Sequence, residues 1–154
     1  MTSHAVPRHT IVPAVHLLLT RGDTILLLRR ANTGFCDGFY SVPAGHVERG
    51  ESATAALIRE AHEEIGIKIL PEDLAACLVM HRKNREAERV DFFFTAASWT
   101  GDVVNGEPGK CDDLAWFAYT DLPDNMVPYV RVAIDLPGQG STYAEFGWDE
   151  PAGP

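Results

Sequence analysis

Residues 43–67 read PAGHVERGESATAALIREAHEEIGI, and this stretch decides the predicted architecture. Glu60, Glu63 and Glu64 stand at i, i+3 and i+4, so in a helix they share one face. Apolar side chains fill the adjoining arc, which can bury against a sheet: Leu57, Ile58, Ala61 and Ile65. The sequence therefore predicts an amphipathic helix whose acidic face lies at the edge of the core.

Both ends of this helix carry recognisable signals. Ser52 precedes an alanine-rich start and is suited to the N-cap position. Gly66 can adopt the left-handed conformation that ends a helix, and the apolar Ile67 follows it. We expect the helix to run from about residue 52 to residue 64.

The acidic face has two interpretations. Carboxylates at these spacings repel one another, and the repulsion grows when they are partly desolvated, so a compensating cation would stabilise them. Oxygen ligands alone suit Mg²⁺ or Mn²⁺. For three glutamates in isolation, a solvated acidic helix face is the commoner explanation.

The other fixed positions of the stretch favour the metal site. Gly45, five residues, Glu51, seven residues and then the run 59–67, REAHEEIGI, match the pattern Gx5Ex7REUxEExGU at every position, with U an apolar residue. This segment resembles the Nudix box. The resemblance implies a hydrolase that cleaves nucleoside diphosphates linked to another group.

The resemblance also implies a mechanism, in which water attacks phosphorus while divalent ions bridge phosphate oxygens and carboxylates. Glu63 and Glu64 are then the expected metal ligands. Glu60 is either a third ligand or the group that orients and deprotonates the water. Three coupled carboxylates titrate as a unit, so the sequence assigns no single pKa to any one of them.

Three further features take roles from the family: an ion pair, a backbone carbonyl and a downstream acid. Glu51 and Arg59 correspond to the pair that forms an ion pair and holds the loop against the helix. A backbone carbonyl beside the box glycine, here that of Ala44 or Gly45, corresponds to a metal ligand. Many members add a base or ligand from a loop far downstream, and the candidates are Glu107, Asp112 and Asp113, with Glu107 preferred.

The substrate contacts are predicted from weaker signals. Arg29 and Arg30 end an apolar run, and at least one of them can reach phosphate, although two solvent-facing arginines fit equally well. Trp116 or Phe117 can supply a flat wall for a nucleobase, while strand alternation turns the other to the core. The segment 107–117 is similar to a stretch of MutT-type enzymes.

This similarity favours hydrolysis of a nucleoside triphosphate to monophosphate and pyrophosphate. An oxidised or otherwise modified nucleoside triphosphate is included in this prediction. A nucleoside diphosphate conjugate such as ADP-ribose is the alternative. Two other classes stay open: a Nudix-fold nucleotide sensor without turnover, and an enzyme like isopentenyl-diphosphate isomerase. The complete set of box glutamates argues against the sensor.

Composition agrees with one enzyme-sized domain spanning residues 1–154, since this length with 45% hydrophobic residues can form a single core. Three unpatterned cysteines predict reduced thiols: Cys36, Cys77 and Cys111. The net charge of −9 disfavours attraction to nucleic acid or anionic lipid, so the expected partner is a small nucleotide. Residues 1–10 lack the apolar core of a signal peptide, and no apolar run reaches membrane length, which predicts a cytoplasmic protein.

The remaining elements follow from apolar runs and turns. Strands are expected at 11–19, 24–28, 41–43, 74–81, 90–98 and 114–119, and a second helix at 126–136. Helices before and after a mixed sheet predict an α/β fold, the three-layer α/β/α sandwich of the Nudix fold, with its core in residues 11–136.

Other segments are expected to be structural. The charged segment 82–89 is expected to form a solvated hairpin tip, and the tail 137–154 a coil packed on the surface, although the tail could instead cover the active-site mouth. The histidines lack metal-ligand spacing, so structural or surface roles are expected for His16, His46, His62 and His81. The resemblance also allows a homodimer, for which the sequence identifies no interface.

Overall fold

A five-stranded mixed sheet forms the centre of the molecule in the computed structural model, which describes residues 5–149. Its strand order is β5-β1-β7-β6-β9, with β1 parallel to β7 and β6 parallel to β9. The strands span Val12–Leu18 (β1), Ala44–His46 (β5), Leu74–Lys83 (β6), Glu88–Ala96 (β7) and Tyr143–Phe146 (β9). Residues 1–4 of the N-terminal stretch and residues 150–154 of the predicted tail lie outside the described residues.

A smaller antiparallel sheet is built around β3, which pairs with β2, β4 and β8. These strands span Thr20–Arg21 (β2), Thr24–Arg30 (β3), Tyr40–Ser41 (β4) and Cys111–Ala118 (β8). The pairing of β3 with β8 brings a segment more than eighty residues downstream beside the start of the chain.

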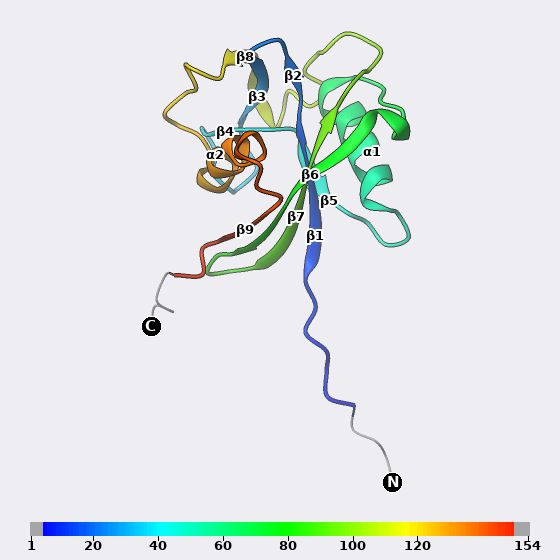
Figure 1. The fold of residues 1–154 in the computed structure, drawn as a ribbon, viewed down its shortest axis with the longest axis vertical. Coiled ribbons are helices and arrows are strands. Elements are labelled where there is room, and N and C mark those ends of the chain that lie inside the picture. The colour runs from blue at the N-terminus through cyan, green and yellow to red at the C-terminus, as the bar shows by residue number, and fades with distance from the viewer. Residues whose placement is uncertain (1–4, 150–154) are drawn as a thin grey trace.

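Helices α1 (Ala53–Ile65) and α2 (Pro128–Asp135) lie on opposite sides of the strands (Figure 1). Alternation along β1 separates two cores: Val15 and Leu17 pack on the α1 side, whereas Leu18 packs on the α2 side. Two short 3-10 turns, Pro71–Asp73 (η1) and Pro137–Gln139 (η2), complete the elements. This arrangement confirms the predicted α/β/α sandwich.

Local signals set the ends of α1. The Ser52 hydroxyl accepts a hydrogen bond from the Ala55 N–H at 3.1 Å, and Gly66 follows the helix with a left-handed φ of 74°. Ala56, Leu57, Ala61 and Ile65 are buried against the sheet. The helix therefore has the predicted caps, and its bounds differ from the prediction by one residue at each end.

Two predictions for the periphery are wrong in part, because both segments contain strand that the sequence did not predict. The tail is not a coil throughout, because β9 adds a parallel strand to β6, with Met80 opposite Ala144. The segment 82–89 is not only a solvated tip, because β6 and β7 continue to Lys83 and Glu88 and leave a short loop. Arg82 at the end of β6 is only 9% exposed.

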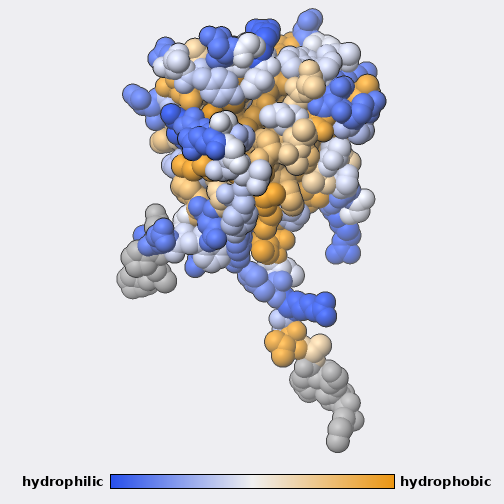
Figure 2. Space-filling model, in the orientation of Figure 1, coloured by the Kyte–Doolittle hydropathy of each residue, from blue (hydrophilic) through white to orange (hydrophobic). Residues whose placement is uncertain are grey.

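The face shown in Figure 2 carries both hydrophobic and hydrophilic residues, with hydrophobic residues visible in the middle and hydrophilic residues around them. Across residues 5–149, the helices are too short or too polar for any of them to traverse a bilayer.

Candidate active site

A single cavity of about 730 Å³ collects most of the predicted site residues. Its walls come from the acidic face of α1, from β5, from the end of β3 and from the loop that precedes β8. The β6–β7 hairpin and Tyr129 of α2 close the other end. Cavities of this size hold small ligands in other proteins.

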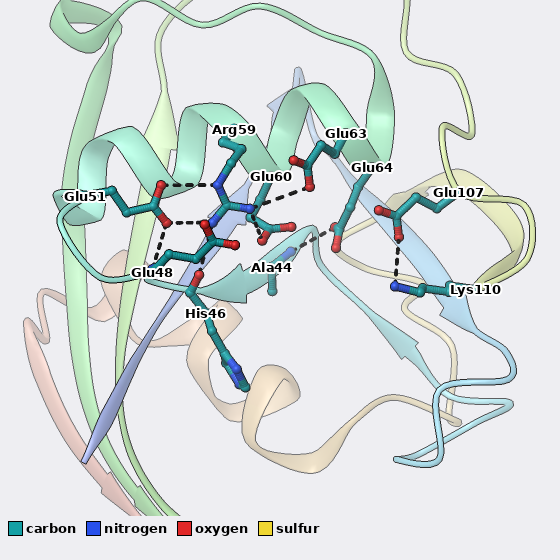
Figure 3. A network of polar contacts seen from close by, with 10 residues as sticks. All are labelled: Ala44, His46, Glu48, Glu51, Arg59, Glu60, Glu63, Glu64, Glu107 and Lys110. Atoms are coloured by element: carbon teal, nitrogen blue, oxygen red, sulfur yellow. Dashed lines mark hydrogen bonds and ion pairs between the residues drawn. The ribbon is translucent and has the colours of Figure 1, made fainter. Parts of the chain in front are cut away.

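Arg59 organises the α1 side of the cavity (Figure 3). Its guanidinium lies 2.6 Å from the Glu51 carboxylate and 2.7 Å from the Glu60 carboxylate, and it also donates to the His46 carbonyl at 3.2 Å. The hydrogen bonds from Arg59 hold the pKa of Glu51 below its usual range. The ion pair expected between Glu51 and Arg59 is therefore present, and it ties the loop before α1 to the helix.

Glu60 and Glu64 are the more enclosed carboxylates of the acidic face. Burial raises the pKa of Glu60, although Arg59 opposes the effect. Burial also raises the pKa of Glu64 to about 8, and its carboxylate accepts one hydrogen bond from the Ala44 N–H at 3.0 Å. Glu63 is more open, with a side chain 47% exposed and 3.6 Å from the Arg59 guanidinium.

The box glycine has a steric reason in this structure. A Cβ on Gly45 would overlap the Glu60 carboxyl group. Any other residue there would push the carboxylate aside, so the glycine lets β5 pass directly against the acidic face of α1. This contact places the backbone around Gly45 beside the carboxylates, as the predicted carbonyl ligand requires.

The loop before β8 is fastened to the end of α1. The Gly106 N–H donates to the Glu64 carbonyl at 2.9 Å, and the Val104 N–H donates to the Ile65 carbonyl at 3.0 Å. A Cβ on Gly106 would overlap the backbone carbonyl of Glu63. This close approach brings Glu107 into the cavity wall, where its charge helps to raise the pKa of Glu60 and Glu64.

The other two downstream candidates have structural partners. Asp112 forms an ion pair with Arg29 at 2.7 Å, and Asp113 accepts a hydrogen bond from the Tyr40 hydroxyl. Neither carboxylate lines the cavity. Glu107 is therefore the downstream acid that the structure brings to the box glutamates.

The donor set fits a divalent cation, although it is not gathered into a finished coordination sphere. Within residues 5–149, no three His, Cys, Asp or Glu side chains already surround one point closely enough to hold a metal. Arg59 and the Ala44 N–H instead engage two of the carboxylates. Enclosed carboxylates with raised pKa values, here Glu60 and Glu64, gain most from a cation. Together with Glu63, Glu107 and the Gly45 carbonyl, they are the groups that would hold Mg²⁺ or Mn²⁺.

Arg30 and Arg29 have separate environments. Arg30 lines the cavity, where its Nε donates to the Phe35 carbonyl at 2.7 Å and an Nη donates to Thr33 at 3.0 Å. Arg29 points to Asp112 outside the cavity. Only one of the two arginines therefore lies where it could meet a phosphate.

The predicted aromatic wall is not supported by the placement of Trp116 and Phe117. Alternation along β8 turns Trp116 to the core under α1 and Phe117 to the core under α2, where Phe117 packs edge-on against Tyr40. Arg21 covers the Trp116 ring at 4.2 Å. Neither residue lines the cavity.

A buried polar group at the other end of the cavity was missed from the sequence. Asp91 is fully buried and accepts hydrogen bonds from Arg82 Nε at 2.7 Å and from His16 Nε2 at 3.0 Å. The Tyr129 ring lies 3.9 Å from the Arg82 guanidinium. The expected structural role of His16 agrees with this packing, but no local pattern marked Arg82 and Asp91 as partners across two strands.

Comparison with known proteins agrees with the box and the fold. The NUDIX domain profile matches residues 10–136, and the chain belongs to the NUDIX family. The chain is 32% identical over 111 residues to the NAD-capped RNA hydrolase NudC of Stutzerimonas stutzeri, and 34% identical over 113 residues to that of Pseudomonas putida strain GB-1. These alignments cover 72% and 73% of this chain, which spans only 38% of the length of either relative.

Solved structures give the same fold. The MutT NUDIX hydrolase from Burkholderia pseudomallei superposes with a TM-score of 0.76 and 25% identity, covering 82% of this chain and 98% of that one. The MutT protein from Methanosarcina mazei superposes with a TM-score of 0.74 at 21% identity, covering 88% and 98% of the two chains. The fold and family are therefore those of Nudix hydrolases.

Proposed function

We propose that this protein hydrolyses a phosphoric anhydride bond in a nucleotide, with a divalent cation held on the acidic face of α1. The observation that carries the proposal is that four carboxylates meet in the wall of one cavity: Glu60, Glu63, Glu64 and Glu107. Four carboxylates without a cation would repel one another and a substrate diphosphate alike. A bound divalent ion would neutralise that charge and orient the diphosphate.

The side chains divide the work. Glu63 and Glu64 are assigned to the cation, and Glu60 is assigned either to it or to the attacking water, which it would orient and deprotonate. Arg59 holds Glu60 in place from the neighbouring position on the helix. Arg30 is assigned to a phosphate oxygen, because its guanidinium lines the same cavity.

Two kinds of substrate are candidates. The relatives described as NAD-capped RNA hydrolases favour a dinucleotide-type diphosphate, and the cavity favours it too because polar groups line both of its ends. The similarity of segment 107–117 to MutT-type enzymes favours a nucleoside triphosphate, cleaved to monophosphate and pyrophosphate, and a MutT NUDIX hydrolase shares the fold. Because Trp116 and Phe117, which belong to the segment similar to MutT-type enzymes, do not line the cavity, we place the diphosphate conjugate first. A cytoplasmic location, a homodimer and the absence of nucleic acid as a partner stay predictions.

The products distinguish these candidates. The protein would be incubated with Mg²⁺ and ADP-ribose, NADH, nucleoside triphosphates or oxidised dGTP, and the products followed by ³¹P NMR. AMP and ribose 5-phosphate from ADP-ribose would support the first candidate, whereas monophosphate and pyrophosphate would support the second. Glu63→Gln should abolish either reaction, and Glu72→Gln, an exposed glutamate in η1, is the matched control. Lack of turnover of every substrate, with Mn²⁺ as well as Mg²⁺, would contradict the proposal and favour a sensor.

A further inference from the structure

Two arginines, Arg82 and Arg89, gather at the end of the cavity away from the α1 carboxylates. The β-sheet register explains it: Arg82 on β6 lies directly opposite Arg89 on β7, and His46 and Asp91 both lie opposite Ala14 on β1. Side chains at paired positions share a face of the sheet, and here that face is the α2 side. Like charges directly opposite are unfavourable, so two facing arginines call for a partner.

Asp91 supplies a partner for only one of them. Both of its oxygens accept from Arg82, at 2.7 and 3.2 Å, and one also accepts from His16. The Arg82 guanidinium is further held over the ring of Tyr129. This leaves Arg82 fixed in one orientation, with its Nη1 group making no hydrogen bond to the described residues.

Arg89 has no such partner. Its guanidinium donates to the backbone carbonyl of Glu88 at 3.1 Å, and it forms no salt bridge to any carboxylate in residues 5–149. Glu48 and Glu86 also line the cavity, but both are exposed and neither forms a salt bridge to Arg89. Within residues 5–149, the Arg89 guanidinium therefore has no carboxylate in direct contact.

His46 completes the group. Its ring points away from the α1 carboxylates (Figure 3). His46 pairs with Ala14, as Asp91 does from the other side of β1, so its side chain lies on the same face of the sheet as Arg82 and Arg89. All three side chains line the same cavity as the box glutamates. We call Arg82, Arg89 and His46 the arginine end.

We propose that the arginine end binds a second phosphate of the substrate, a monoester on the half of the molecule that lies beyond the scissile diphosphate. A phosphomonoester carries nearly two negative charges and three acceptor oxygens, which matches one free guanidinium, one fixed guanidinium and an imidazole N–H. A neutral base in this position would leave the charge of Arg89 uncompensated. The substrate class is thus a diphosphate conjugate with a ribose 2′- or 3′-phosphate, an inference that rests on the proposed function.

Matched substrate pairs test this inference. Each pair differs by one phosphate: ADP-ribose and its 2′-phosphate, NADH and NADPH, and dephospho-coenzyme A and coenzyme A. The wild-type protein should prefer the phosphorylated member of the 2′ or the 3′ pairs by about 10- to 100-fold in kcat/KM, mainly through KM, as expected for a hydrogen-bonded charge pair. The pair that shows the preference identifies the position of the phosphate.

Arg89→Gln should reduce this preference to near unity, whereas Arg85→Gln should preserve it. Arg85 is the matched control because it lies at the exposed tip of the same hairpin and does not line the cavity. Equal turnover of both members by the wild-type protein, or a preference that survives Arg89→Gln, would overturn the inference.

A binding measurement separates this inference from the proposed function. Calorimetry would compare AMP with adenosine 2′,5′-bisphosphate and 3′,5′-bisphosphate, using wild type, Arg89→Gln and Arg85→Gln. One bisphosphate should bind about 10-fold or more tightly than AMP, and only Arg89→Gln should remove the difference. If no substrate is hydrolysed, the proposed function fails, but this comparison still decides whether the arginine end binds a second phosphate. Equal affinities for AMP and both bisphosphates would refute it.

Discussion

Replacing Asp91 by asparagine should destabilise the protein strongly. Asp91 is fully buried and receives three hydrogen bonds, two from Arg82 at 2.7 and 3.2 Å and one from His16 at 3.0 Å. Asparagine preserves the shape but leaves the 10% exposed Arg82 side chain with an uncompensated charge. Breaking a buried ion pair in this way costs about 3 to 5 kcal/mol.

Urea unfolding at pH 7 would measure this loss. Asp135→Asn is the matched control, because its ion pair with Arg131 has the same 2.7 Å distance but is about half exposed, and it should cost about 0.5 kcal/mol or less. A double-mutant cycle with Arg82→Met and Asp91→Asn should give a coupling energy of at least about 1.5 kcal/mol. A loss below about 1 kcal/mol for Asp91→Asn would refute the reasoning.

The same pair predicts a pH dependence. Burial works to raise the pKa of Asp91, but the hydrogen bonds from His16 and Arg82 outweigh it and hold the pKa below its usual range. The stabilisation is therefore present above the unfolded pKa of about 3.9 and is lost as the pH falls through the lower folded value. The difference in free energy of unfolding between wild type and Asp91→Asn should shrink as the pH is lowered below about 4.

Three further predictions concern the acidic face and two tight backbone contacts. Burial raises the pKa of Glu64 to about 8, so ionising this carboxyl in the folded state costs free energy. In EDTA, the free energy of unfolding of the metal-free wild type should therefore fall relative to that of Glu64→Gln as the pH rises from about 5 to 8. Urea titrations in which this difference does not change with pH would contradict the prediction. Gly106→Ala should lower the free energy of unfolding by about 1 to 3 kcal/mol and reduce turnover, because the added Cβ would displace the loop that carries Glu107. Gly109→Ala, which meets open space, should change neither quantity. Gly147→Ala should cost about 1 to 3 kcal/mol and speed hydrogen exchange in β9, because Gly147 has a φ of +82° and a Cβ on it would overlap the end of β6. Gly138→Ala, which meets open space, is the control. Equal exchange rates in the two variants would count against a docked tail.

The parts of the fold set by local chemistry were predictable. Ser52 and Gly66 cap α1 through contacts within one turn of the chain, so the sequence is enough to place them. The spacing of the box glutamates likewise fixes their common face, whatever the rest of the fold does. The same holds for the ion pair between Glu51 and Arg59, which the resemblance implied and the structure contains.

The parts set by long-range pairing were not predictable. The facing of Arg82 and Arg89 depends on the register of β6 with β7, and the contact of Asp91 with His16 joins strands 75 residues apart. The same limit applies to β9, because its pairing partner β6 lies about sixty residues earlier. A single sequence does not contain these registers in any local pattern.

The error over Trp116 has a related cause. Strand alternation predicted that either Trp116 or Phe117 would face a core. It did not indicate that β8 has a core on each side. In a three-layer sandwich, both faces of such a strand are covered, so neither side chain was left for the cavity.

The central claim is that the acidic face of α1 holds the cation that hydrolysis needs. Turnover of ADP-ribose would be measured against Mg²⁺ concentration for wild type, Glu60→Gln, Glu63→Gln and Glu64→Gln, with Glu72→Gln as the exposed control. We expect no turnover of the wild type without a divalent cation and a loss of at least about 100-fold in kcat for each variant of the α1 face, with the control unchanged. Wild-type turnover in EDTA, or full activity in all three variants, would contradict the claim.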